Sequence, residues 1–303
     1  MAGWRYPSFL RRVLPLGLKN GLRKLRVRIL TPYLTRHLPR NQEFAQSLED
    51  AQATETLSIV VPVHDAPGVT RRCLASLEKY APKAEIILVD DGSKLEVTRK
   101  LLADVSKRNG WRLIRHAEPL GHSAACGAGA AAATRAYLCL LNSDTVVTPW
   151  CWRRIAQAFE ENPEIGVAGP STSSSANPQT LPLVDFARHA LNDSQICAFA
   201  GRLLTTGPGD ALTDLPWVSG FAFFLRRSLW EQLGGFDRNL PDYSNEVELC
   251  SRVLAAGHRV VWVRTSYIHH LGGASYTKAL DDESIWARIE AGRDYVAQKR
   301  SQT

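Results

Sequence analysis

The first half of the chain alternates short apolar runs with helical stretches, and this alternation limits the possible folds more than any other feature. Residues 57–63 (LSIVVPV) and 85–93 (EIILVDDGS) are typical of buried strands, and a third apolar strand is expected in residues 137–144 (YLCLLNSD). Helical stretches lie between these runs, including one over residues 97–108 that precedes a short strand at 111–115. Strands that alternate with helices pair in parallel, so their carboxyl ends meet at one edge of the sheet, where ligands bind. We therefore predict an α/β fold with a mixed, mostly parallel sheet flanked by helices.

The second half is less regular. A helix is expected over residues 150–162 and a strand over 166–168. The polar stretch STSSSANPQT (171–180) follows, which we expect to be a loop and a candidate for mobility. Upstream of it, residues 128–133 are all alanine or glycine, and we expect them to let a helix approach the sheet closely. No internal repeat is evident.

The basic residues are concentrated near the amino terminus. The chain has a net charge of +7, from 37 lysines and arginines against 30 acids. Residues 1–41 hold ten of the basic residues and no acid, so the remaining 27 basic residues leave the body mildly acidic. Within this arm four apolar residues fall at helical spacing opposite the basic side chains, namely Leu18, Leu22, Leu25 and Ile29. We expect residues 1–40 to bind an anionic membrane surface; the alternative is a helix packed on the body with a solvated basic face.

Other classes of protein fit the sequence less well. The six cysteines are widely spaced without a CxxC pair, which predicts reduced, mostly buried thiols in a cytoplasmic protein. No stretch approaches the roughly 18 apolar residues of a membrane-spanning helix, and no secretion signal is evident. Nucleic-acid binding is not expected, because no binding fold accompanies the basic arm.

Three acidic clusters lie at or just beyond the ends of strands and helices: Asp90 with Asp91, Asp144, and Glu246 with Glu248. Carboxylate oxygen is the ligand that Mg²⁺ and similar hard cations prefer, and such cations neutralise a diphosphate during transfer reactions. Asp144 directly follows an apolar strand and is the best placed for this role. Alternatively it is a turn or helix-capping acid, because the residues up to Pro149 also resemble a helix start.

Six segments in order resemble the family 2 glycosyltransferases of the GT-A fold, over about residues 56–275. They read LSIVVPVHD, EIILVDDGS, LCLLNSDTVV, WVSGFAFFLRRSLWEQLGGFD, NEVELCSRVLAAGHRVVWV and YIHHLGGAS. The resemblance implies an inverting, metal-dependent enzyme, of the kind that builds bacterial surface polysaccharides or transfers rhamnose. It also implies a nucleotide-diphosphate sugar as donor and Mn²⁺ or Mg²⁺ as cofactor.

The resemblance assigns roles to residues in each segment. The nucleotide would contact Pro62, Val63, His64, Asp90, Asp91, Asn142, Ser143 and Asp144. Asp144 would hold the metal together with His269, or else with His270. Glu246 would be the general base that takes the proton from the acceptor hydroxyl as it attacks the anomeric carbon. The acceptor would meet Trp217, Gly220, Tyr243 and Glu248.

Several of these residues also have a structural interpretation. His269 is a candidate for a buried, hydrogen-bonded histidine, and Glu248 for a partner of the helix dipole. Trp217 and Tyr243 are candidates for core packing.

The chain departs from the family pattern at three positions. Asn245-Glu246 replaces the usual Glu-Asp, Asn142 replaces a frequent aspartate, and Gly127 replaces a common asparagine. The longer side chain at the base position changes its reach, and the amide at 142 leaves one carboxylate in the metal motif.

Two other enzyme classes are disfavoured. The GAGAAA stretch formally fits a dinucleotide-binding fingerprint, but a polar stretch of about ten residues separates it from the preceding strand. A sugar-phosphate nucleotidyltransferase would need a glycine-rich start followed by basic residues, which is absent. A catalytically silent binding module of the same fold is the alternative outside the enzymes.

We therefore expect three parts. A basic arm (1–54) precedes a GT-A domain (55–275), whose halves bind nucleotide sugar (55–149) and acceptor (150–275), and a helical tail (276–303) follows. The expected activity is transfer of a hexosyl or deoxyhexosyl group to a glycan or lipid-linked acceptor. The expected location is the cytoplasm, peripheral on the inner face of the cell membrane.

Overall fold

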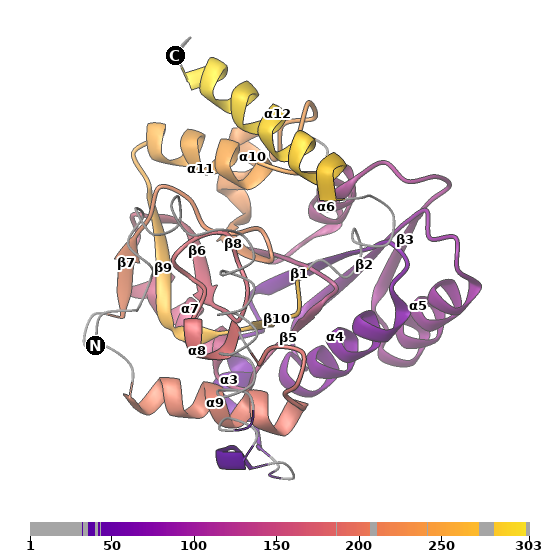
Figure 1. Ribbon diagram of the computed structural model, residues 1–303, viewed down its shortest axis with the longest axis vertical. Helices are drawn as coiled ribbons and strands as arrows, with labels where there is room; N and C mark the ends of the chain where they lie inside the picture. Colours follow the sequence, from indigo (N-terminus) through magenta and orange to yellow (C-terminus); the bar gives the residue numbers. More distant parts are fainter. Residues whose placement is uncertain are drawn as a thin grey trace.

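The computed structural model describes residues 32, 36–39, 42, 44–185, 187–206, 211–240, 242–272 and 282–300. Within these residues a twisted sheet has the strand order β3-β2-β1-β4-β8-β6-β9-β7 (Figure 1). Its strands are β1 (Leu57–Val63), β2 (Glu85–Asp91), β3 (Arg112–His116), β4 (Tyr137–Leu141), β6 (Ile165–Ser171), β7 (Leu212–Asp214), β8 (Ala222–Arg226) and β9 (Arg259–Tyr267). A second, two-stranded sheet pairs β5 (Thr145–Val146) with β10 (His269–His270).

The sheet is mixed and mostly parallel in its first half, as predicted. β3, β2, β1 and β4 run parallel to one another, whereas β8 is antiparallel to both β4 and β6. The predicted strands at 57–63, 85–93 and 111–115 are confirmed with small shifts at their ends. The carboxyl ends of β1, β2 and β4 therefore gather at one edge, because parallel strands share their direction.

Helices cover both faces of the sheet. One core cluster joins the sheet to α4 (Pro67–Tyr80), α5 (Glu96–Asn109) and α7 (Cys151–Glu161). A second joins its other face to α6 (His122–Ala132), α10 (Arg227–Leu233) and α11 (Asn245–Ala255). Along β1 the side chains alternate accordingly, since Ile59 and Val61 belong to the first cluster and Val60 to the second. Burial on both faces explains the unbroken apolar runs in the sequence.

The helix rich in small residues lies very close to the sheet, as expected. Gly129 of α6 faces Val60 of β1, and a Cβ on this glycine would lie only 2.2 Å from Cγ1 of that valine. The backbones of α6 and β1 can approach this closely only because position 129 has no side chain.

A third apolar cluster lies beneath α8 (Pro182–Asp185) and α9 (Asp193–Thr206), and α9 is a helix that the sequence pattern did not predict. It includes Leu38, so part of the predicted arm packs on the body. The short helix α3 (Leu48–Gln52) does so too, since Arg153 of α7 pairs with Asp50 at 3.0 Å. The proposed membrane-binding stripe in residues 18–29 lies outside the described residues. None of the helices that the structure describes is both long and apolar enough to cross a bilayer.

The polar stretch 171–180 is largely a loop, as expected, but it is packed into the protein. Its side chains Ser171, Thr172, Ser173, Asn177 and Gln179 are buried, and most take part in hydrogen bonds. Near the carboxyl terminus the helix α12 (Asp282–Arg300) packs against α11 (Figure 1).

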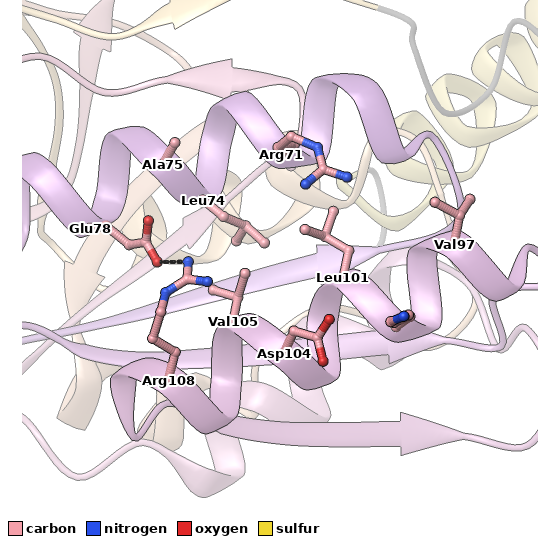
Figure 2. Close-up of a pocket in the computed structure, with 10 residues that line it drawn as sticks. Arg71, Leu74, Ala75, Glu78, Val97, Leu101, Asp104, Val105 and Arg108 are labelled. Carbon is pink, nitrogen blue, oxygen red and sulfur yellow. Dashed lines mark hydrogen bonds and ion pairs between the residues drawn. The ribbon is translucent and has the colours of Figure 1, made fainter.

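A groove of about 360 Å³ lies between α4 and α5 (Figure 2). Its floor is apolar, and the ion pair between Glu78 and Arg108 crosses one end of it. None of the predicted site residues lines this groove, so it is separate from the candidate site.

Candidate functional site

The ends of β1 and β2 form the first wall of the candidate site. Val63 pairs with Asp90 across the two strands, and Pro62, Val63 and Asp90 are buried, whereas His64 is partly exposed. Asp90 accepts the amide hydrogen of Ser93 at 3.0 Å and lies 3.5 Å from Nε of Arg115. These predicted nucleotide-binding residues therefore lie together at the expected edge of the sheet.

The side chain of Asp91 binds the loop that precedes α6. Its carboxylate accepts hydrogen bonds from the backbone amides of Leu120 and Gly121, both at 2.9 Å, and contacts Nδ1 of His116 at 2.7 Å. Its backbone oxygen contacts Nδ1 of His64 at 2.8 Å. Asp91 thus holds the backbone that leads into α6, beside the residues predicted to bind the nucleotide.

Asp144 and His270 face each other. Asp144 follows β4 within a turn that also contains Asn142 and the buried Ser143, and its Oδ1 lies 3.2 Å from Nε2 of His270. The small β5–β10 sheet brings the two segments together, because it pairs His270 with Thr145, the residue after Asp144. Phe221 stacks on the His270 ring at 5.2 Å and fixes its plane.

His269, the predicted partner of Asp144, lies elsewhere. It is fully buried, with Nδ1 2.8 Å from the hydroxyl of Tyr267 and Nε2 2.8 Å from the carbonyl oxygen of Arg188. Burial lowers its pKa to about 3, so it is neutral with both ring nitrogens satisfied. The structural interpretation of His269 therefore holds, and His270 is the histidine beside Asp144.

The hydrogen bonds of His270 fit a metal ligand. Nδ1 lies 2.7 Å from the carbonyl oxygen of Ser174, so this nitrogen must carry a proton. In the neutral ring Nε2 then points a lone pair at a carboxylate oxygen, and a cation between the two relieves that repulsion. A separation of 3.2 Å is close to the roughly 3 Å between neighbouring ligands of an octahedral ion with bonds of about 2.1 Å. Metal-binding histidines usually donate their other ring hydrogen to such a carbonyl.

Without a metal, protonation of the ring serves the same purpose. Burial lowers the pKa of His270, but the charge and hydrogen bond of Asp144, aided by the Ser174 carbonyl, raise it above its usual value. Within the described part of the chain no cluster of three or more histidine, cysteine or acidic side chains has metal-binding geometry. The pair can therefore supply two protein ligands, and any others would come from water or a bound phosphate.

Glu246 lies at the start of α11, next to the segment that carries Phe221. A Cβ on Gly220 would lie 3.7 Å from the carboxyl carbon of Glu246, so this side chain runs along the glycine. Burial raises the pKa of Glu246, and the backbone amides of Glu246 and Gly220 offset only part of the rise. Phe221, which follows Gly220, stacks on His270. Residues 220–221 therefore link the carboxylate of Glu246 to the Asp144–His270 pair.

Glu248 does not contribute to this site. It is buried and paired with Arg252 and with Lys299 of α12, the latter at 2.6 Å. Its predicted contact with the acceptor is therefore replaced by an ion pair that joins α11 to α12. Trp217 and Tyr243 are both partly exposed, and Trp217 packs against the second core cluster.

His122 is a further residue of this site that no motif in the sequence indicated. At the start of α6 its Nε2 lies 3.3 Å from Oδ1 of Asn142, and its Nδ1 lies 3.4 Å from Nδ2 of Asn245. Asn245 also donates to Ser123 at 2.9 Å. His122 thus connects the Asp144 turn with the helix that carries Glu246. Its position directly before the small-residue helix was the available signal.

Known proteins share both the sequence pattern and the fold. O-antigen biosynthesis protein RfbC of Myxococcus xanthus is 28% identical over 88% of this chain and 22% of its own length. The uncharacterized protein y4gI of Sinorhizobium fredii is 24% identical over 84% of this chain and 28% of its own length. The chain thus spans only about a quarter of the length of these curated relatives.

Solved glycosyltransferase structures have the same GT-A fold. GalNAc-T7 with UDP, GalNAc and Mn²⁺ superposes with a TM-score of 0.56 at 17% identity, over 85% of this chain and 52% of that one. The mannosyltransferase PcManGT of Pyrobaculum calidifontis with GDP-Man and Mn²⁺ gives 0.52 at 16% identity, over 84% and 67% respectively. At these identities the likeness concerns the fold alone.

The model of the family named "Glycosyl transferase family 2" matches residues 58–234, which is more than half of the chain. The match includes Asp90, Asp144 and Gly220 and ends before Glu246 and His270. Together with the predicted order of motifs and the observed GT-A fold, it establishes that this chain belongs to glycosyl transferase family 2.

Proposed function

We propose that the protein transfers a sugar from a nucleotide-diphosphate donor to an acceptor hydroxyl, with inversion at the anomeric carbon. The observation that carries the proposal is the Asp144–His270 pair, whose oxygen and nitrogen lie 3.2 Å apart at the carboxyl edge of the sheet. The proposed acceptor is a glycan or lipid-linked saccharide of a surface polysaccharide. The name of the Myxococcus relative, an O-antigen biosynthesis protein, supports this choice.

Asp144 and His270 are the proposed ligands of a divalent cation, Mn²⁺ or Mg²⁺. When bound, the cation would neutralise phosphate oxygens and assist departure of the nucleoside diphosphate. Two solved proteins with the same fold contain Mn²⁺, one with UDP and one with GDP-Man. Ser174 holds the His270 ring so that Nε2 faces Asp144.

Glu246 is the proposed general base. Burial raises its pKa, which makes the ionised carboxylate a better proton acceptor than that of an exposed glutamate. It takes the proton of the acceptor hydroxyl while that oxygen attacks the anomeric carbon from the side opposite the diphosphate. Below its pKa Glu246 is protonated and cannot accept, so kcat/KM is expected to fall toward acid pH.

The two sides of the proposed active site have different proposed ligands. Pro62, Val63, His64 and Asp90 would contact the base and ribose, and Trp217 and Tyr243 would contact the acceptor. Aromatic rings offer a sugar an apolar face together with a polar edge, which suits this role.

The decisive experiment compares the wild type with a Glu246→Gln variant in a screen of nucleotide sugars with Mn²⁺ or Mg²⁺. The variant is expected to lose activity by at least about 100-fold. Glu160→Gln is the matched control, because Glu160 is exposed on α7. Full activity of Glu246→Gln would refute the role of the base. A wild type that binds nucleotide sugars without turnover would instead identify a silent binding module.

Metal binding has its own readout. Mn²⁺ titrated with UDP or GDP present and followed by electron paramagnetic resonance is expected to bind the wild type. Binding is expected to weaken by about 10–100-fold in His270→Asn. His258→Asn is the control, since His258 lies beside Gly166 near the start of β9. Equal Mn²⁺ affinity of the two variants would exclude His270 as a ligand.

We further propose that residues 1–40 bring the enzyme to the inner face of an anionic membrane. Neutralising Arg23, Lys24, Arg26 and Arg28 to glutamine in the full chain is expected to abolish sedimentation with anionic vesicles at low salt. Unchanged sedimentation would favour the alternative, an arm packed on the body.

A further inference from the structure

The buried polar segment 171–180 contacts both sides of the proposed active site. On one side Ser173 holds the backbone of His270: its hydroxyl accepts from the His270 amide at 3.0 Å and donates to the His270 carbonyl at 2.8 Å. The carbonyl of Ser174 accepts the Nδ1 hydrogen of the same ring. This half of the segment therefore fixes the position and tautomer of His270.

The other half holds the segment before β8. Gln179 is fully buried, and its Oε1 accepts hydrogen bonds from the Ser219 amide and from Nδ2 of Asn177, both at 2.7 Å. Asn177 also donates to the carbonyl of Trp217 at 3.2 Å. Two side chains of one segment thus fix residues 217–219, directly before the glycine that contacts Glu246.

The surroundings of Gln179 fit a side-chain amide in one orientation. Nε2 donates to the carbonyl of Pro170 at 2.8 Å, so the amide oxygen must be the atom that faces Ser219. A Cβ on Gly169 would lie 2.5 Å from Nε2, so only a glycine in β6 leaves room for this amide. A buried amide that uses both ends leaves little freedom for the backbone it binds.

We propose that Gln179 is a positioning residue that sets the distance between the proposed base Glu246 and the Asp144–His270 pair. It acts through Ser219 and Gly220, while the serines of the same segment hold His270. This inference rests on the proposed function, because only sugar transfer requires the general base and the leaving group to be held at a fixed distance from each other. Misplacement by about 1 Å can reduce such a reaction about 100-fold.

The test uses Gln179→Met, which keeps the length of the side chain and removes its hydrogen bonds. The exposed Gln157→Met is the matched control. Faster hydrogen exchange is expected at the amides of residues 219–221 in Gln179→Met alone. kcat is expected to fall about 10–100-fold while the donor KM changes less than about twofold, since β1 and β2 are untouched. Loss of the Gly220 contact is also expected to shift the acid limb of the kcat/KM profile to higher pH.

Each result decides the proposal. Unchanged exchange at 219–221, or an unchanged kcat beside altered exchange, would overturn it. In the wild type the Ser219 amide should be among the slowly exchanging ones, so fast exchange there would overturn the proposal even if the variant failed to fold. A wild type without transferase activity would refute the proposed function, whereas the exchange data would still decide whether Gln179 holds this segment.

Discussion

Alanine at position 129 is expected to destabilise the protein, although glycine-to-alanine changes usually stabilise a helix. The ordinary gain inside a helix is about 0.8–1.0 kcal/mol. A Cβ at Gly129 would lie 2.2 Å from Cγ1 of Val60 and 3.0 Å from its Cγ2, well inside van der Waals contact. Val60 is fully buried on β1, which is paired with a strand on each side, so it cannot move away without disturbing the sheet. Overpacking of this kind costs roughly 1–3 kcal/mol, and the severity of the overlap places it at the upper end.

The expected net effect is a loss of about 2 kcal/mol, measured as the free energy of unfolding in urea. Gly127 provides the control in the same helix, because a Cβ there would meet nothing within 4 Å. Gly127→Ala is therefore expected to stabilise by about 0.8–1.0 kcal/mol, so the two alanine variants should differ by about 3 kcal/mol. Equal effects of the two substitutions would refute the packing argument.

A double-mutant cycle with Val60→Ala isolates the contact. Val60→Ala alone removes the methyl groups that the new Cβ would strike and leaves a cavity. The double variant is expected to be more stable than the sum of the single effects predicts, because the methyl group introduced by Gly129→Ala fills part of that cavity. Strict additivity would show that Gly129 is required for another reason.

Three further outcomes are expected. Gly292→Val should lower the melting temperature by a few degrees, since even a Cβ on Gly292 would lie 2.9 Å from Oγ of Ser244; an unchanged temperature would contradict the close packing of α12. The pKa of Asp237 is held at about 2 against partial burial, chiefly by Lys299. Its stabilising effect is present above its ordinary pKa of 3.8 and is lost as pH falls through about 2, so Lys299→Met should lose less stability between pH 6 and pH 2 than wild type. All six cysteines are buried, and burial raises the pKa of Cys73 to about 12, so Ellman's reagent should react only on unfolding.

The sheet was predictable because its strands are buried on both faces. Such strands are unbroken apolar runs, and β1 has the predicted bounds, Leu57–Val63. The helix α9 (Asp193–Thr206) was missed, since its buried residues pack in a separate cluster with loops distant in sequence. The burial of the polar segment 171–180 was not predicted, for a related reason. Its serines and amides are satisfied by partners up to about a hundred residues away, which no local pattern indicates.

Helical geometry already argued against one predicted residue. Glu246 and Glu248 are two positions apart on α11, and residues at that spacing point to different sides of a helix. If Glu246 faces the site, Glu248 must face away from it, where it meets Arg252 and Lys299. The pairing of Glu248 with Lys299 of α12 could be found only from the tertiary structure, whereas the position of Glu248 outside the site followed from helix geometry alone.

The identity of the histidine beside Asp144 depends on the phase of a very short strand. Successive side chains of a strand point to opposite faces, so only one of His269 and His270 can face Asp144. The sequence contains both, and the pairing of β10 with β5 places His270 opposite Thr145 and His269 opposite Val146. Strand alternation alone would then put Asp144 on the face of His269. Asp144 precedes β5, within the turn after β4, and its carboxylate lies beside His270 instead. The bond from the Leu271 amide to the Asp144 carbonyl continues this pairing. A shift of one residue would exchange the two histidines, because register determines which face each side chain takes. The chemistry proposed for this edge of the sheet therefore depends on a two-residue pairing that the polar segment 171–180 stabilises from the other side.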